Sequence, residues 1–128
     1  MTERLYFIVD LRREWTGNPY ITLWGPNCGG YAYPLPWAGR YTAAEIESRG
    51  DYLTCRRYLD GKGFVGVWDR FGVACDEIER HATAPDLVGQ GRIDGNAGPV
   101  VRNSAAMRAY LRRVRYVLAS PADAEVAA

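Results

Sequence analysis

The chain has 128 residues and a formal net charge of +1. This length suffices for one domain with its own core, and the near-zero charge excludes a protein drawn to nucleic acid or membranes by its overall field. Hydrophobic residues make up 48% of the chain and charged residues 24%, which excludes a largely disordered protein.

The first forty residues predict short strands separated by turns. Residues 5–9 form a compact apolar run of strand formers and predict a buried strand. Residues 17–19 mark a turn, and residues 20–24 predict a second strand that pairs with the first in antiparallel fashion. Residues 31–33 predict a short third strand, and the prolines at positions 34 and 36 then prevent regular pairing.

The middle of the chain predicts a helix and a hairpin. Thr42 and Glu45 have the spacing of a capping box, which predicts a helix over residues 43–49 that is stopped by Gly50 and has Ile46 as its core contact. The Asp60-Gly61 pair lies between β-rich segments, so we expect residues 53–59 and 64–68 to form a β-hairpin.

Three short elements and a long loop are expected after the hairpin. Residues 69–72 predict a turn and residues 73–75 a brief strand. Asp76 is the predicted cap of a short helix that runs through position 81. Residues 83–99 have little periodicity and several glycines, so they are predicted to form a long loop.

The last predicted helix covers residues 104–118 and has Asn103 as its cap. Its apolar residues recur at helical spacing on one face, which we expect to pack on the core. They are Met107, Tyr110, Leu111, Val114 and Leu118. The whole pattern predicts an α+β fold, with a small, mostly antiparallel sheet and two or three helices. One domain is expected over residues 1–118, followed by a flexible C-terminal tail over residues 119–128.

The three cysteines, at positions 28, 55 and 75, are odd in number and widely spaced, which argues against the disulfide framework of a secreted protein. No apolar stretch approaches the length of a membrane span, and the apolar run near the N-terminus is too short for a signal peptide. We therefore expect a cytoplasmic protein that does not associate with membranes.

The first candidate site is an aromatic segment shaped by glycines and prolines, which we call the aromatic turn region. Rigid aromatic side chains with a polar atom are typical anchors of binding surfaces, but they also fill cores. Both interpretations are open from the sequence. The residues of this region are Trp24, Asn27, Tyr31, Tyr33, Trp37, Arg40 and Tyr41.

The second candidate site is the basic face of the last predicted helix. Arg108, Arg112 and Arg115 recur at helical spacing, and residues 102–116 hold five arginines and no acidic residue. Such a face could bind phosphates or an acidic partner. It could also be an ordinary solvated face whose arginines suit the C-terminal end of the helix dipole.

No pattern in the chain predicts catalysis, a metal or a cofactor. The three cysteines and His81 are of the types that bind zinc, but they lack the close Cys pairs of structural zinc sites. A helix would place Cys75 and His81 too far apart for a nucleophile and its base. Residues 89–91 lack the lysine and hydroxyl residue of a phosphate loop. The carboxylates at positions 60, 69, 76 and 94 are scattered at predicted turns.

One block of the sequence resembles a known group of proteins. It consists of Trp-Gly-Pro-Asn at residues 24–27, Gly-Tyr at residues 30–31, and Ala-Gly-Arg-Tyr-Thr at residues 38–42 with Glu45. This block resembles a pattern in small bacteriophage and prophage proteins of unknown function. Those proteins also open with a β-rich segment and carry a Val-Val-x-Asn element, here residues 100–103. Residues 50–71 have no counterpart in the pattern. The resemblance implies a phage or prophage origin and no particular activity.

The leading functional hypothesis is a non-catalytic accessory protein that binds a protein partner or a second copy of itself through one of these two candidate sites. This hypothesis is based on the aromatic content of 12% and on the lack of a catalytic pattern. The alternatives are a nucleic-acid-binding module that uses the arginines of the last helix, and a small enzyme of unknown reaction.

Overall fold

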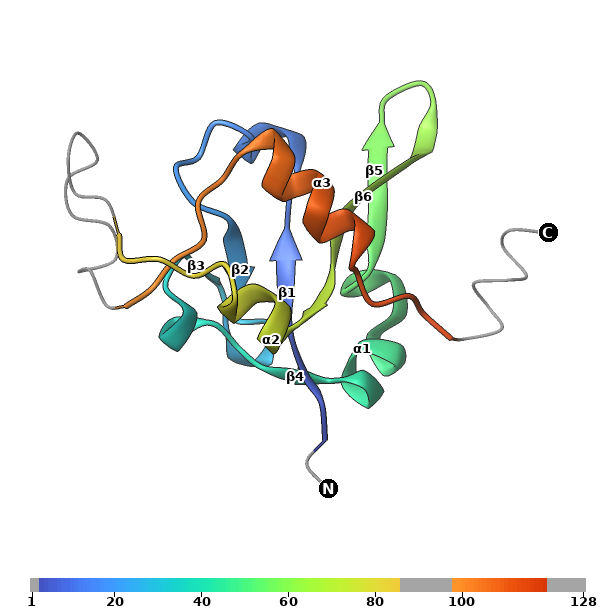
Figure 1. Cartoon of the computed structure of the whole chain (residues 1–128). Coiled ribbons are helices and arrows are strands. Elements are labelled where there is room, and N and C mark those ends of the chain that lie inside the picture. Colours follow the sequence, from blue (N-terminus) through green and yellow to red (C-terminus); the bar gives the residue numbers. More distant parts are fainter. Residues whose placement is uncertain (1–2, 86–97, 120–128) are drawn as a thin grey trace.

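The computed structural model describes residues 3–85 and 98–119, which form one small α+β domain built on a mostly antiparallel sheet (Figure 1). Five strands lie in the order β3-β2-β1-β6-β5, and β4 pairs with β1 beside them. The strands are β1 Leu5–Asp10, β2 Thr22–Trp24, β3 Tyr31–Ala32, β4 Tyr41–Thr42, β5 Cys55–Leu59 and β6 Gly63–Ala74. The helices are α1 Ala43–Arg49, α2 Cys75–Glu79 and α3 Ala105–Arg113. Four single-turn 3₁₀ helices join them: η1 Arg13–Trp15, η2 Pro26–Cys28, η3 Leu35–Trp37 and η4 Gly50–Tyr52. The predicted fold class is confirmed.

The central strand β1 explains why its sequence is a continuous apolar run. Its first residues pair with β4 and its last residues with β2 on one side, while β6 pairs along its other side. Phe7 and Val9 face a main core that α2 and α3 cover. Ile8 faces a second cluster of Trp24, Tyr41, Ile46 and Leu53, to which α1 contributes. Because both faces of β1 are buried, apolar residues occupy every position of its middle.

The strand β6 is longer than predicted, and the turn expected at residues 69–72 is wrong. These residues continue the strand and pair with β1, with Val9 opposite Phe71 and Ile8 opposite Gly72. A Cβ atom at Gly72 would lie 2.8 Å from Cδ1 of Ile46, so a larger residue there would require the buried Ile46 side chain to shift. The polar residue Asp69 is tolerated in the strand because its carboxylate is paired with arginines, a condition that nearest-neighbour patterns do not reveal.

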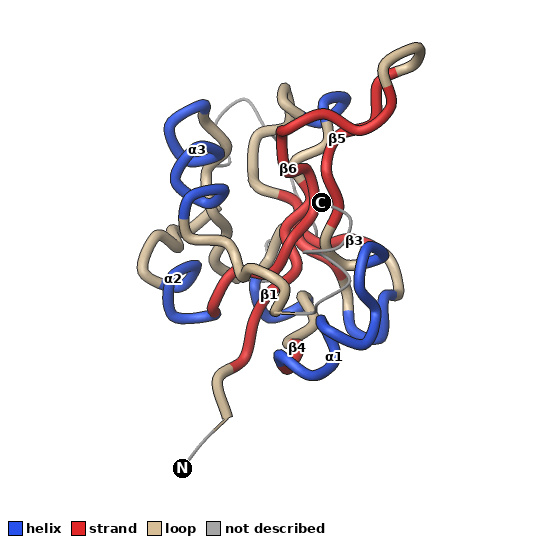
Figure 2. The backbone as a smooth tube through the Cα atoms, turned by 90° about the vertical axis from the view of Figure 1, so that its right-hand side faces the viewer, coloured by secondary structure: helices blue, strands red, loops and turns tan. Residues whose placement is uncertain are grey.

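The predicted hairpin is confirmed as β5 and β6, and it projects from the body of the domain. Its tip stands away from the rest of the described chain in two perpendicular views (Figures 1 and 2). Gly61 and Gly63 both have left-handed backbone conformations, with φ of 80° and 74°, which the turn requires. Tyr58 lies opposite Phe64 across the two strands. The hairpin therefore displays side chains that the core does not cover.

The helix α1 has the bounds that its sequence predicts. The side chain of Thr42 accepts a hydrogen bond from the backbone of Glu45, and Glu45 accepts one from the backbone of Thr42, so the capping box is complete. The chain leaves the helix at Gly50, and Ile46 is fully buried. Local hydrogen bonding is sufficient to define the start of this helix, because both capping partners lie within one turn.

The other two helices differ from the prediction at their ends. Asp76 lies inside α2 and makes an ion pair with Arg4, so it does not cap the helix. The N-cap of α3 is Ser104, whose hydroxyl accepts from the backbone N–H of Met107. The helix ends at Arg113 rather than at position 118. In place of capping, the amide of Asn103 donates to the carbonyls of residues 15, 16 and 18 and ties α3 to the η1 segment.

The residues after α3 leave the helix to lie along β6. The backbone N–H of Tyr116 donates to the carbonyl of Gly72, and its ring packs edge-on against Tyr6 at 5.1 Å. The Tyr116 hydroxyl donates to Glu47 of α1 at 2.7 Å, and the backbone of Ala119 donates to the same oxygen at 2.6 Å. These tertiary contacts outweigh the continued helical pattern of the sequence.

The contact between Tyr116 and Glu47 predicts a stability loss at alkaline pH. The hydrogen bond to Glu47 raises the pKa of Tyr116 to about 12, so the folded state favours the protonated phenol. Its contribution is complete below about pH 10, the pKa of an unfolded tyrosine, and is lost as pH rises to about 12. We expect Tyr116→Phe to lose less stability over this interval than the unchanged protein, as measured by urea unfolding. Parallel curves for the two proteins would contradict this linkage.

Two sequence predictions concern segments that are only partly described. At the ends of the predicted loop of residues 83–99, Thr83 forms an antiparallel bridge with Val100. Residues 86–97 of that loop, and residues 120–128 of the predicted tail, lie outside the described residues. Within the described part of the chain, none of the helices combines the length and apolar character needed to cross a bilayer.

Candidate binding surface

The aromatic turn region divides into buried and exposed residues. Trp24 is 5% exposed and Tyr41 is 3% exposed, and both belong to the second core cluster. The indole N–H of Trp24 donates to Asp10 at 3.0 Å. The Tyr41 hydroxyl donates to the carbonyl of Gly25 and accepts from the backbone of Cys28. These two predicted binding residues therefore belong to the core, where hydrogen bonds within the protein satisfy their polar atoms.

Of the remaining candidates of this region, Tyr33 is half-buried and packs edge-on against Tyr20, and the other four lie at the surface. Tyr31 is 54% exposed and Trp37 is 50% exposed. Asn27 is exposed and has a left-handed backbone with φ of 55°, as the tight turn requires. Arg40 makes an exposed ion pair with Glu79 at 3.2 Å. A binding role for these four residues stays a prediction.

The predicted basic face of the last helix is not a free surface. Arg112 points into the fold, where its Nε donates to the carbonyl of Trp68 at 2.7 Å and its Nη2 to Asp69 at 3.2 Å. Burial lowers the pKa of its guanidinium. Arg108 donates to Asn103 at 2.6 Å, and Arg115 donates to the carbonyl of Arg112 at 2.9 Å. Arg112 therefore ties α3 to the sheet, and Arg108 reaches the carbonyl of Thr16 beside the η1 segment, whereas Arg115 bonds within its own segment. A binding role for this face stays a prediction.

The structure instead brings charged residues together in an open groove of about 860 Å³ between the η1 segment and the β5–β6 hairpin. Six of its lining residues are cationic and four are acidic. The cations are Arg12, Arg13, Arg56, Arg57, Lys62 and Arg70, and the acidic residues are Asp10, Glu14, Asp60 and Asp69. Tyr58 and Phe64 line the same groove from the hairpin.

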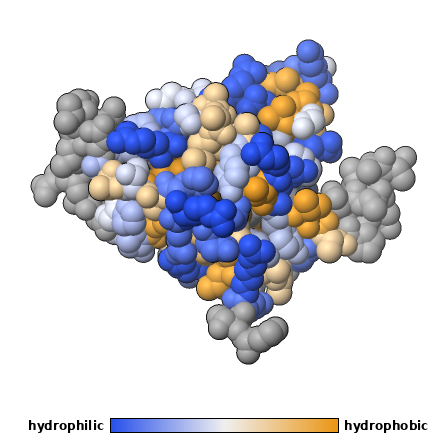
Figure 3. Space-filling view, viewed as in Figure 1, coloured by the Kyte–Doolittle hydropathy of each residue, from blue (hydrophilic) through white to orange (hydrophobic). Residues whose placement is uncertain are grey.

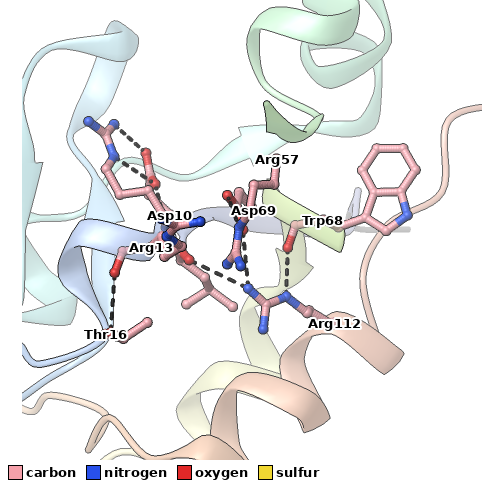
Figure 4. Close-up of polar contacts among 9 residues, drawn as sticks. Asp10, Arg13, Thr16, Arg57, Trp68, Asp69 and Arg112 are labelled. Carbon is pink, nitrogen blue, oxygen red and sulfur yellow. Dashed lines mark hydrogen bonds and ion pairs between the residues drawn. The ribbon is translucent and has the colours of Figure 1, made fainter. Parts of the chain in front are cut away.

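Two buried carboxylates anchor the walls of the groove. Asp69 is 8% exposed and receives two hydrogen bonds of 3.0 Å from Arg57, while Arg112 reaches it from the helix side (Figure 4). Asp10 is 2% exposed and receives Nε and Nη2 of Arg12 at 3.1 and 2.8 Å. Such bidentate ion pairs offset the desolvation cost of burying the charges.

Arg12 is held rigidly in this wall. Its guanidinium lies 3.8 Å from the centre of the Trp15 ring and 5.4 Å from that of Tyr31. It also donates to the Tyr31 hydroxyl at 3.2 Å. The hydrogen bonds to Asp10 raise the pKa of Arg12 above its ordinary value. Tyr31, a candidate from the sequence, is thus joined to the wall of the groove.

Three cations of the groove have no anionic partner among the residues that the structure describes. Within the described residues, the side chains of Arg13, Arg56 and Lys62 make no hydrogen bond or ion pair with the protein. Arg56 lies 5.8 Å from the ring of Trp68. Unlike Arg12 and Arg57, these three are available to an external anion.

Sequence patterns alone did not select this groove. Tyr58 and Phe64 flank the hairpin turn at positions that pair across the two strands, and this pairing follows from the predicted turn. The approach of the η1 segment to the hairpin depends on the sheet order, which places β6 between β1 and β5. The pairing of the hairpin aromatics could therefore be predicted from the sequence, whereas the groove could not.

The three cysteines lie in different parts of the described fold. Cys28 packs against the second core cluster, Cys75 lies in the main core, and Cys55 lines the groove. Burial raises the pKa of the Cys55 and Cys75 thiols, which disfavours the nucleophilic thiolate. Among the residues that the structure describes, no three potential metal ligands of the His, Cys, Asp and Glu types gather. Residues 89–91 and Asp94 lie outside the described residues.

No family model, curated protein or solved structure matches this chain. The fold and the groove define an α+β domain with a projecting hairpin and a charged, aromatic-edged surface. Its function is inferred from the chemistry of that surface.

Proposed function

We propose that this protein is a non-catalytic protein-binding module, and that the groove with its hairpin is the surface that binds the partner. The single observation that carries the proposal is the aromatic pair on the projecting hairpin beside cations with no partner in the described protein. A cytoplasmic location, an accessory role, and a phage or prophage origin belong to the same proposal, and of these only the origin is implied by the sequence resemblance.

The aromatic pair supports binding because it is ordered yet uncovered. Tyr58 and Phe64 are both 61% exposed, and their rings pack edge-on with centres 5.3 Å apart. Figure 3 shows hydrophobic and hydrophilic residues side by side on the projecting hairpin. Aromatic and arginine side chains are enriched in protein interfaces and contribute much of their binding energy.

The mixed charge of the groove favours a protein partner over nucleic acid. Four carboxylates lie among the six cations of the lining, and the whole chain has a net charge of only +1. A nucleic-acid-binding domain ordinarily presents a strongly basic face. A protein segment, in contrast, can match both signs of charge. The groove is also held by its internal ion pairs, which reduces the entropy lost on binding.

A capture experiment with hairpin variants tests the proposal. We expect Tyr58→Ser and Arg56→Glu each to weaken the affinity for a purified partner by about tenfold or more, because each removes an interface contact of the type that contributes most to binding. The partner is first captured from a lysate of the native host, and its affinity for each variant is then measured by calorimetry.

Two matched controls make the result specific. Val117 is 60% exposed and Arg49 is exposed in α1, and neither lines the groove. Val117→Ser and Arg49→Glu should therefore leave the affinity unchanged. A partner that binds all four variants equally would contradict the proposed surface.

Nucleic acid binding is the second candidate, since the unpaired Arg13, Arg56 and Lys62 lie in one groove with aromatic rings on which bases could stack. It predicts binding of oligothymidylate that weakens steeply as salt is raised. Fluorescence anisotropy at low ionic strength decides this, and the absence of binding there eliminates the alternative.

A further inference from the structure

Arg70 differs from the other arginines that reach the buried part of the groove. Its side chain is 20% exposed, and its nearest carboxylate oxygen, on Asp10, lies 3.9 Å from Nη1, too far for a hydrogen bond. Its buried Nε has no hydrogen-bond partner in the described protein. Arg12 and Arg57, in contrast, each make two-pronged hydrogen bonds to a carboxylate.

Within the described part of the chain, Asp10 does not complete the hydrogen bonding of Arg70, because both of its oxygens are already occupied. One oxygen of Asp10 accepts from the backbone and Nε of Arg12. The other accepts from Nη2 of Arg12 and from the indole of Trp24. A carboxylate oxygen accepts about two hydrogen bonds comfortably, so Arg70 keeps unused donors.

The guanidinium of Arg70 is nevertheless held in place. It lies 4.9 Å from the ring centre of Trp24 and 5.8 Å from that of Tyr52. The two rings themselves pack edge-on at 5.4 Å. A planar cation that is fixed on aromatic rings and has unused hydrogen-bond donors is organised in advance for a planar anion.

We propose that Arg70 is the carboxylate-recognition residue of the groove, and that the partner binds with an acidic, extended segment whose Asp or Glu side chain pairs with this guanidinium. The proposal rests on the protein-binding function proposed above and names the chemistry of the partner. The planar carboxylate matches the two terminal Nη groups of the guanidinium, since the Nε atom is buried and outside the reach of a partner. With a single charge, it also suffers less repulsion from Asp10, Glu14, Asp60 and Asp69 than a phosphate would.

The rest of the groove explains why the segment should carry more than one acidic residue. Arg13, Arg56 and Lys62 line the same groove and have no partner among the described residues. Tyr58 and Phe64 offer apolar surface at its edge. A segment in which acidic and aromatic residues alternate satisfies both features.

The probe for the first experiment is a synthetic peptide of alternating glutamate and tyrosine. We expect its addition to shift the Arg70 Nε–H signal in the nitrogen–proton NMR spectrum of the unchanged protein. The same peptide with glutamine in place of glutamate should not do so. An Arg70 signal that does not move at saturating peptide, or that moves equally with the glutamine peptide, overturns the proposal.

The second experiment measures the affinity of the same peptide for variants. Arg70→Lys keeps the charge but loses the fork, so we expect it to weaken binding by about tenfold, and Arg70→Gln by at least as much. Arg49→Gln serves as the control and should bind normally. Thermal unfolding checks that each variant is folded. If a variant is not folded, the NMR experiment on the unchanged protein tests the role of Arg70. Equal binding by Arg70→Lys and the unchanged protein overturns the role of Arg70.

Two outcomes separate this inference from the proposed function. If oligothymidylate displaces the peptide and itself shifts the Arg70 signal more strongly, the acidic-segment partner is overturned in favour of nucleic acid. If a captured protein partner depends on Tyr58 and Arg56 but is insensitive to Arg70→Lys, the inference fails while the protein-binding function stands.

Discussion

Replacing Asp10 by alanine is expected to destabilise the fold by about 3–5 kcal/mol, the ordinary cost of removing one partner of a buried ion pair. Asp10 is 2% exposed and accepts hydrogen bonds from Arg12 and from the indole of Trp24. Its removal leaves the guanidinium of Arg12 and a buried indole N–H without their acceptor. Urea unfolding monitored by tryptophan fluorescence measures the change.

Two comparisons identify the source of the loss at Asp10. Asp10→Asn keeps the shape and one acceptor oxygen, so it should lose less stability than Asp10→Ala, although its amide NH2 then faces the donors of Arg12 or Trp24. Asp60→Ala changes an exposed carboxylate at the hairpin and should change stability by no more than about 0.5 kcal/mol. A cost at Asp10 as small as that at Asp60 would mean that the ion pair does not stabilise the wall of the groove.

The second large effect is expected at Gly39. A Cβ atom there would lie 2.6 Å from Cα of Pro26 and 2.8 Å from the carbonyl oxygen of Gly25. Both neighbours are backbone atoms, so no rotation of a side chain relieves the overlap. We expect Gly39→Ala to destabilise the protein by about 3 kcal/mol, at the upper end of the usual cost of overpacking.

Gly66 provides the matched control for Gly39. A Cβ atom at Gly66 would meet nothing within 4 Å, so Gly66→Ala should change stability by less than about 0.5 kcal/mol. Thermal unfolding of the two variants compares them directly. Equal melting temperatures would show that the segment around Pro26 can move away at little cost.

The close packing at Gly39 also gives the sequence block of residues 24–42 a physical role. Gly39 donates to the carbonyl of Trp24, and Gly25 donates to the carbonyl of Gly30. Gly25 could not carry a side chain either, because its Cβ would lie 2.3 Å from the carbonyl oxygen of Gly29. Much of the block therefore builds a tight structural turn, and Tyr31 is the member that joins the wall of the proposed binding groove.

The sequence by itself determined the elements whose signals are local. The capping box defines α1, the Asp-Gly turn defines the hairpin, and the apolar run defines β1, because each depends on residues within a few positions of one another. The α+β fold class follows from these elements and from the apolar face of α3.

Only the tertiary structure decided which way the candidate side chains face. Arg112 has the spacing of a surface arginine, yet it turns inward because Asp69 and the carbonyl of Trp68 lie beneath it. Trp24 turns inward because Asp10 accepts its indole N–H. The groove itself forms from the η1 segment and a hairpin that begins about forty positions further along the chain. Contacts between distant segments depend on strand order and on the pairing of buried charges, and neither is encoded in the spacing of neighbouring residues.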